Sequence, residues 1–179
     1  MDDQELEHIF YEKENGHQIL KCIQCGTCSG SCPLTGEMDH APRELFALIR
    51  DGGIREALGS TTPWYCVSCY QCMVRCPQQI PVADLMYALK RLALSAGLAC
   101  SGHKMPDMYK AFDQVTRRFG RITEPVVMAR YGLGHPGDVL ANLPTAIRML
   151  GRGRIGLLPQ RTREPKKIRA LLASRNQEE

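Results

Sequence analysis

Two short runs of cysteines constrain this chain more than any other feature of its sequence. The first run is Cys22-Ile-Gln-Cys25-Gly-Thr-Cys28-Ser-Gly-Ser-Cys32-Pro, and the second is Cys66-Val-Ser-Cys69-Tyr-Gln-Cys72-Met-Val-Arg-Cys76-Pro. Both follow the pattern C-x₂-C-x₂-C-x₃-C-P, and the second run repeats the first 44 residues further along. Thiolates at this spacing on a tight turn can reach three corners of one iron–sulfur cubane, so the pattern predicts two [4Fe–4S] clusters.

The last cysteine of each run is expected to serve the cluster of the other run. In two-cluster proteins with this pattern, the cysteine before the proline is directed away from its own run and ligates the other cluster. The first cluster is therefore assigned to four cysteines, namely Cys22, Cys25, Cys28 and Cys76. The second cluster is assigned to the other four, namely Cys66, Cys69, Cys72 and Cys32.

Zinc is the main alternative for these cysteines, because a repeated C-x₂-C pair makes an ordinary Cys₄ zinc site. Each run here holds four cysteines rather than two and ends on the same proline, an arrangement that zinc does not need. The ferredoxin-type pattern is therefore favoured. Two complete sets of four thiolates leave no iron with an open coordination position, which favours outer-sphere electron transfer, and no catalytic residue is assigned.

The residues around the cysteines predict different surroundings for the two clusters. Small residues from Gly26 to Ser31 would let backbone N–H groups approach the sulfurs of the first cluster and raise its reduction potential. The bulkier Tyr70 and Val74 predict better shielding from water for the second cluster. The ninth cysteine, Cys100, stands beside Ala and Leu and is more typical of a small buried hydrophobic residue than of a redox-active thiol.

Apolar side chains between and after the runs recur at helical spacing, and no segment shows the evenly spaced alternation of an all-β protein. Pro42 is placed to open a helix that ends at Gly52, and Pro81 is placed to open another that ends at Gly97. Further helices are expected at residues 54–58, 107–119, 137–142 and 144–150. The sequence therefore predicts an all-α protein, in which a helical ferredoxin-type domain holds its clusters at loop–helix junctions.

Charge and cysteine content divide the chain into three parts. Residues 1–20 form an acidic N-terminal segment, and residues 21–100 form the helical dicluster domain. Residues 101–179 form a helical and basic C-terminal extension, which lacks interleaved aromatic residues and any helix-turn-helix or zinc-finger pattern. Nucleic acid is therefore not an expected partner. Three apolar residues favour a docking arm for a partner protein over a solvated tail, namely Ile155, Leu157 and Leu158.

The sequence also predicts where the protein works. Its first residues are acidic and polar, unlike the basic and apolar regions of a signal peptide. The most apolar stretch, Val82 to Cys100, is interrupted by Lys90 and Arg91 and is too polar to span a bilayer. We therefore expect a soluble, cytoplasmic protein without a membrane span of its own, whose thiols stay reduced and available to metal.

Several segments make this chain similar to the C subunits of the heterodisulfide reductases. They are the first run IQCGTCSGSCP, the helix start APREL, the second run with its preceding W-x-C, the helix PVADL and the late segment LPTAIRMLGRGRIGLLPQR. The cysteine runs alone are shared with the iron–sulfur subunits of succinate dehydrogenase and anaerobic glycerol-3-phosphate dehydrogenase. The GRGRIGLLP sequence is what favours the heterodisulfide reductase family. Ala41 stands where the family pattern has a serine helix cap, which affects stability rather than the resemblance.

The resemblance implies an electron-transfer subunit of a larger oxidoreductase. Such a subunit relays electrons between an A-like flavin and iron–sulfur protein and a B-like catalytic protein that reduces or forms a disulfide. The family has methanogen, bacterial bifurcating and sulfur-oxidising branches, and the sequence leaves open the branch, the electron donor and acceptor and the direction of flow. An iron–sulfur subunit of another dehydrogenase complex or a free soluble ferredoxin is the alternative, although a shuttle is usually small and acidic.

Overall fold

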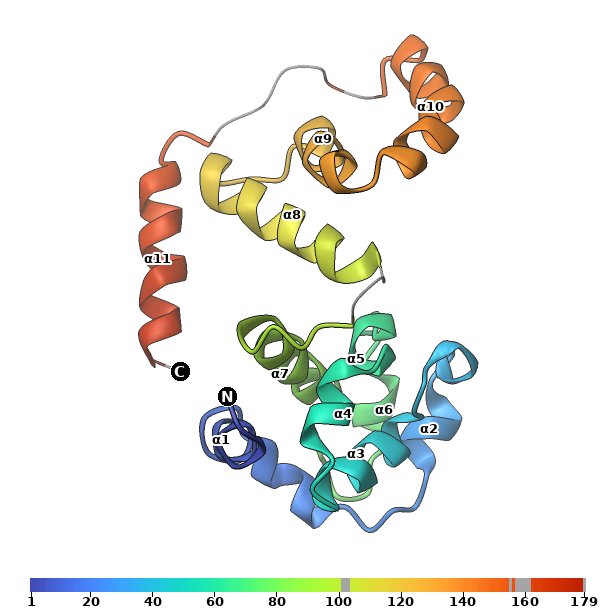
Figure 1. The fold of residues 1–179 in the computed structure, drawn as a ribbon, viewed down its shortest axis with the longest axis vertical. Helices are drawn as coiled ribbons and strands as arrows, with labels where there is room; N and C mark the ends of the chain where they lie inside the picture. The colour runs from blue at the N-terminus through green and yellow to red at the C-terminus, as the bar shows by residue number, and fades with distance from the viewer. Residues whose placement is uncertain (101–103, 155, 157–161, 179) are drawn as a thin grey trace. The chain divides into compact units, whose positions relative to one another are not determined.

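The computed structural model describes residues 1–100, 104–154, 156 and 162–178, and these residues form helices and loops without a strand (Figure 1). The all-α prediction is confirmed. The chain forms two compact units, Met1–Pro106 and Asp107–Glu179. The functional division predicted at residues 20 and 100 stays a prediction.

Short helices connected by tight loops build the first unit. In chain order they are α1 (Asp3–His8), the π-helix η1 (Ile9–Lys13), the 3₁₀ helix η2 (Gly16–Lys21), α2 (Thr27–Ser31), the 3₁₀ helix η3 (Thr35–Glu37), α3 (Pro42–Arg50), α4 (Ile54–Gly59), α5 (Thr62–Tyr65), α6 (Gln71–Val74) and α7 (Val82–Ser95). The acidic N-terminal segment belongs to this core, because Leu6, Phe10 and Ile19 are fully buried. Its first helix is therefore amphipathic, with apolar side chains in the core and carboxylates outside it.

Helix α3 begins at Pro42 as predicted, although Ala41 offers no side chain to cap it. The Ala41 N–H donates to the Glu44 carboxylate at 3.0 Å, and the Arg43 N–H donates to the Ser29 hydroxyl at 3.0 Å. Two N–H groups that a helix start leaves without helical partners are thus bonded by side chains. Since Ser29 belongs to the first cysteine run, its bond fixes that run to the start of α3.

The segment that leaves the first run is tied to the segment that enters the second. The Thr61 N–H donates to the Asp39 carboxylate at 2.7 Å, and the Thr61 hydroxyl oxygen accepts the Asp39 N–H at 3.2 Å. The Thr62 hydroxyl accepts the His40 N–H at 3.0 Å and donates to the His40 carbonyl at 2.8 Å. Thr62 is fully buried, so water does not compete for its two bonds. This pairing, which we call the threonine clamp, holds the two cysteine-bearing loops together.

Helix α7 supplies the apolar stripe predicted after Pro81. The helical spacing of Val82, Leu85, Met86, Leu89 and Ala93 in the sequence predicts one apolar face, and all five are buried. Gly97 follows the helix with a φ of +68°, a left-handed conformation that favours glycine. Within the described ranges, no helix combines the length and the apolar character that crossing a membrane requires.

Beyond α7, the described residues form α8 (Lys104–Phe119), α9 (Glu124–Gly134), α10 (Pro136–Gly151) and α11 (Pro165–Glu178). The second unit has a small core of Ala111, Val115, Val127 and Tyr131, with Met108 and Phe119 packed against it. Helix α8 carries the first half of this core and α9 the second. None of the residues of α10 is buried.

Several expectations for the second unit are wrong. The helices predicted at 137–142 and 144–150 are one helix, α10, which continues through Pro144. A proline removes one helical hydrogen bond, but intact turns on both sides can carry the helix past it. Met108, Phe112, Val115 and Phe119 recur at helical spacing, which predicts one buried face, but Phe112 is 38% exposed and Ala111 is buried instead. Helices α9 and α11 were not predicted, and the residues Ile155, Leu157 and Leu158 lie outside the described part of the chain.

A polar network reinforces the second unit. The Tyr131 hydroxyl donates to the Asp138 carboxylate at 2.7 Å, and the Tyr131 ring stacks on His135 with the ring centroids 4.5 Å apart. His135 Nε2 lies 3.1 Å from the Asp107 carboxylate. Burial, followed by the bond to Asp138 and its negative charge, raises the pKa of Tyr131 to about 12. Tyr131 therefore joins α9 to the start of α10 as a neutral hydrogen-bond donor.

Replacing Tyr131 by Phe is expected to loosen the second unit while leaving the first unchanged. A hydrogen bond to a charged group contributes about 1.5–3 kcal/mol, and the variant loses this bond without losing the ring. Hydrogen exchange of the backbone amides of α9 and α10 should become faster, whereas exchange in α3 should not change. Unchanged exchange in α9 and α10 would contradict the role assigned to this bond.

Candidate iron–sulfur cluster site

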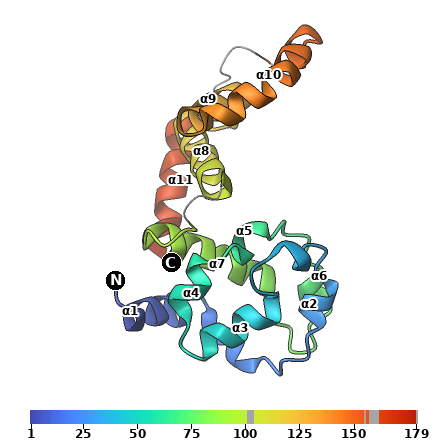
Figure 2. The same cartoon turned by 45° about the vertical axis from the view of Figure 1, so that its right-hand side comes forward.

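The two cysteine runs adopt the same backbone conformation. In each run, the residues on both sides of the second cysteine have left-handed φ angles, namely +59° at Gln24, +76° at Gly26, +56° at Ser68 and +60° at Tyr70. For a residue other than glycine this conformation costs about 1–2 kcal/mol, so the loops are held by their surroundings rather than by local preference. Each loop leads into a short helix, α2 or α6, and these two helices contact each other (Figure 2).

A first hollow in this unit brings together cysteines from both runs. It has a volume of about 360 Å³, including space open to solvent, and Phe46, Ile80 and Val82 form part of its wall. The cysteines that line it are Cys22, Cys25, Cys28 and Cys76. The fourth cysteine of the second run thus lies with the first three of the first run.

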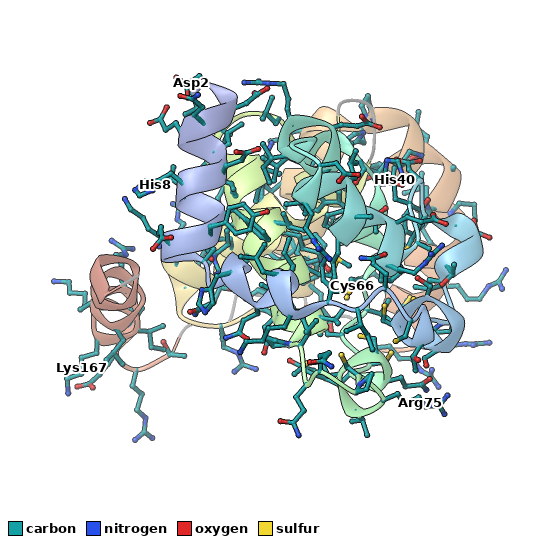
Figure 3. The ribbon with its side chains drawn as sticks, turned by 90° about the horizontal axis from the view of Figure 1, so that it is seen from below. Asp2, His8, His40, Cys66, Arg75 and Lys167 are labelled. Carbon is teal, nitrogen blue, oxygen red and sulfur yellow. The ribbon has the colours of Figure 1, made fainter. Side chains whose placement is uncertain are left out.

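The second hollow contains the complementary set. It has a volume of about 420 Å³, again including open space, and Leu34, Tyr65 and Met86 form part of its wall. The cysteines that line it are Cys32, Cys66, Cys69 and Cys72. Figure 3 shows sulfur atoms gathered around the labelled Cys66. The structure therefore groups the sulfurs as crossed ligation requires, while the ligand assignment itself stays a prediction.

The two hollows share a wall. Val82, at the start of α7, lines both of them. At the start of α3, Pro42 lines the second hollow and its neighbour Arg43 lines the first. The starts of these two helices therefore separate the two sets of cysteines, which places both at loop–helix junctions.

Each set has one cysteine at the surface. Cys25 and Cys69, the second cysteines of their runs, are exposed, and the other six are partly buried. The residues that suggested better shielding of the second set, Tyr70 and Val74, do not provide it. Tyr70 lines the second hollow but is 44% exposed, and Val74 is 86% exposed, so neither side chain closes that hollow against water.

Hydrogen bonds to sulfur are present in the first set, although their backbone donors lie outside the segment of small residues from Gly26 to Ser31. The Gln24 N–H donates to Cys22 Sγ at 3.4 Å, and the Ile80 N–H donates to Cys76 Sγ at 3.4 Å. Cys25 Sγ lies 3.3 Å from the Thr27 hydroxyl. Such bonds stabilise the thiolate form of a ligand and raise the potential of a cluster bound to it.

The cysteines differ in how readily they lose their protons. The hydrogen bond from Thr27 lowers the pKa of the Cys25 thiol, whereas burial raises the pKa of Cys28. Burial, followed by repulsion from Cys66, raises the pKa of Cys72 to about 11. Since only thiolates ligate iron, binding of a metal centre here must release protons from the buried cysteines.

This donor set fits iron–sulfur clusters. Each hollow offers four soft sulfur donors in a mainly apolar wall, and no His, Asp or Glu among the described residues lines either hollow. Within those same ranges, no three His, Cys, Asp or Glu side chains are close enough to share one metal ion. Cys100 is partly buried and lines neither hollow.

Two cationic residues near the cysteines were missed by the sequence prediction. Arg50 Nη1 donates to the Cys22 carbonyl at 2.9 Å, and Lys90 Nζ donates to the Cys66 carbonyl at 3.2 Å. Lys90 could have been noticed, because it is a charged residue within the apolar part of α7. Arg50 gives no such signal, since a basic residue in the last turn of a helix is ordinary.

Known proteins resemble this chain in sequence. A family model described as a 4Fe-4S dicluster domain matches residues 18–80, which include both runs. The iron-sulfur C subunit of the CoB–CoM heterodisulfide reductase of Methanopyrus kandleri is 32% identical over 105 residues, which cover 59% of this chain and 55% of that protein. The C subunit of the ferredoxin:CoB-CoM heterodisulfide reductase of Methanosarcina mazei is 38% identical over 94 residues, covering 51% and 56% of the two chains. The match spans about half the length of these two relatives.

One relative matches over a longer stretch. An iron-sulfur C subunit of the CoB–CoM heterodisulfide reductase of Methanocaldococcus jannaschii is 31% identical over 138 residues. These residues cover 73% of this chain and 68% of the relative. The similarity therefore extends beyond the cysteine runs.

Proposed function

This chain belongs to the C-subunit family of the heterodisulfide reductases, and we propose that it relays electrons through two [4Fe–4S] clusters within a complex of that type. It is an iron–sulfur electron-transfer subunit of an oxidoreductase. Beyond this role, we propose the number of clusters, the cysteines that ligate them and the partner proteins. Electrons would pass between an A-like flavin and iron–sulfur protein and a B-like protein that carries out the disulfide chemistry.

One observation supports the two-cluster relay most directly, namely the division of eight cysteines between two adjoining hollows. We assign Cys22, Cys25, Cys28 and Cys76 to one cluster. We assign Cys32, Cys66, Cys69 and Cys72 to the other. Four thiolates complete the coordination of each cluster, which leaves no position for a substrate. The chain is then a relay rather than the catalytic subunit.

The chain's own residues would ligate the clusters, tune their reduction potentials and leave one edge of each accessible to a partner. A bound cluster supplies one-electron redox chemistry. The apolar walls limit contact with water, and the N–H groups of Gln24 and Ile80 stabilise two of the thiolates. Beside the exposed Cys25 and Cys69 stand Ile23 and Val67, which are 61% and 64% exposed. These apolar side chains at the surface support an electron-exchange face that is covered when a partner docks.

We assign the docking part of this role to a groove in the second unit, between α9 and α10. The groove has a volume of about 1320 Å³, including open space, and its wall is almost entirely apolar. Leu133 is 87% exposed, Leu140 69% and Met128 47%. An exposed apolar surface of this kind on α9 and α10 is typical of a face that a partner protein covers.

The partner segment that fits the groove is an amphipathic helix with acidic flanks. Residues 121–154 carry five arginines, namely Arg121, Arg130, Arg148, Arg152 and Arg154. They are opposed by two carboxylates, Glu124 and Asp138. Apolar residues at helical spacing would fill the groove, and acidic residues would face the arginines. A second copy of this chain would fit the groove poorly. Its acidic amphipathic helix is α1, and the apolar residue Leu6 of that helix is already buried in the core of its own chain.

Metal and sulfide analysis tests the cluster part of the proposal. Protein purified without oxygen should contain about eight iron and eight acid-labile sulfide per chain. Stoichiometric zinc without sulfide would refute it. Native mass spectrometry of the endogenous protein separates a bound subunit from a free ferredoxin, because only the subunit should be found with A-like and B-like proteins.

A further inference from the structure

Each cysteine run has a cationic side chain bonded to the carbonyl of its first cysteine. Arg50 donates to the carbonyl of Cys22 at 2.9 Å, and Lys90 donates to that of Cys66 at 3.2 Å. The two cations occupy equivalent positions relative to the repeated runs but differ in burial. Arg50 is exposed, whereas Lys90 is only 4% exposed.

Lys90 is held in place against the second run. Its Nζ lies 5.0 Å from the centroid of the Tyr87 ring, within the range of a cation–π contact. The Tyr87 hydroxyl accepts a hydrogen bond from the Ser68 hydroxyl at 2.7 Å, and Ser68 stands between Cys66 and Cys69 in the chain. Two side chains of α7 thus contact the loop that carries two cysteines of the second hollow.

A cluster ligated by Cys66 would favour a cation at the position of Lys90. Burial of an ammonium group is unfavourable unless negative charge nearby compensates for it. A neutral side chain such as glutamine could bond the Cys66 carbonyl without this cost. The thiolates of the second hollow, together with the cluster that we assign to them, would add negative charge near the Cys66 carbonyl to which Lys90 is bonded.

We propose that Lys90 raises the reduction potential of the cluster that Cys66 ligates. Reduction adds one negative charge to the cluster, and a fixed cation close by stabilises the reduced form more than the oxidised form. The interaction is stronger at low dielectric, so buried Lys90 acts on its cluster more than exposed Arg50 acts on the cluster of Cys22. This inference rests on the proposed function only in that Cys66 ligates a cluster, whether or not the ligation is crossed.

Redox titration of the full-length protein, followed by electron paramagnetic resonance, tests the inference. Iron and sulfide are measured first in every variant. Lys90→Gln, which can keep the hydrogen bond without the charge, should lower the potential of one cluster and leave the other unchanged. Lys90→Arg should keep the potential close to that of the wild type. Arg50→Gln should lower the potential of the other cluster, and by a smaller amount.

Controls separate charge from geometry. Tyr87→Phe removes the bond to Ser68 but keeps the ammonium, so it should move neither potential. A fall in potential for Tyr87→Phe as large as that for Lys90→Gln would overturn the inference, because the position of the loop would then be the cause. So would unchanged potentials in Lys90→Gln protein with full iron and sulfide. Wild-type protein without iron and sulfide would instead refute the proposed function, and the inference with it.

Discussion

Replacement of Cys32 by Ser should remove the cluster of the second cysteine run, although Cys32 belongs to the first. Cys32 lines the hollow that also contains Cys66, Cys69 and Cys72, whereas the other three cysteines of its own run line the adjacent hollow. A serine hydroxyl is a harder and less acidic ligand than a thiol, so the affected cluster should be lost or strongly perturbed. Iron and sulfide should fall from about eight to about four per chain.

The reciprocal variant and a control make this prediction specific. Cys76→Ser should remove the cluster of the first run, and its remaining paramagnetic spectrum should complement that of Cys32→Ser. Cys100→Ala should keep the full iron content, because Cys100 lines neither hollow. If Cys32→Ser perturbs only the cluster of its own run, the crossed assignment is wrong.

The second large effect is expected in the second unit. Replacing Leu133 and Leu140 together by Asp should release the chain from its complex while both clusters stay in place. Each leucine contributes about 1.5–3 kcal/mol when fully buried in an interface, and a carboxylate at such a site adds a further penalty. The loss of at least about 3 kcal/mol corresponds to a more than 100-fold increase in Kd. The aspartates would also repel the acidic flanks expected of the partner helix.

The measurement is co-purification with the cognate A-like and B-like proteins, expressed together with this chain. Leu171→Asp is a matched control, because Leu171 is 69% exposed but belongs to α11 rather than to the groove. Electron transfer through the complex should fall in the double variant, whereas reduction of the purified chain by a small chemical donor should not. An intact complex in the double variant would rule out the groove as the docking surface. Binding to anionic vesicles but to neither protein would identify a membrane surface instead.

The parts of the fold that depend on local pattern could be predicted from the sequence. Pro42 and Pro81 mark helix starts, and the stripe from Val82 to Ala93 is buried as its spacing indicates. The grouping of the cysteines also follows from the repeated run, because its spacing alone distinguishes the fourth ligand from the other three. In each of these cases the signal lies within a few residues along the chain.

Features that depend on residues far apart in the chain could not be predicted. The threonine clamp pairs Asp39 with Thr61, which are 22 residues apart and show no pattern in common. Helix α9 was not predicted, so the apolar groove that it forms with α10 was not predicted either. Pro144 also led to a wrong prediction of two helices. The structure has one helix, α10, which continues through this proline.

The mixing of cysteines from both runs in each hollow has a consequence for biosynthesis. Under crossed ligation, neither cluster has its full set of ligands until the second run is translated, to Cys72 for the second cluster and to Cys76 for the first. At about 5–20 residues per second, a ribosome that has added Cys28 needs about 2–10 s more to reach Cys76. During this interval the nascent chain carries three cysteines without their fourth partner. Cluster insertion would therefore follow synthesis of the second run, and a chain truncated before Cys76 would be unable to complete the cluster of the first.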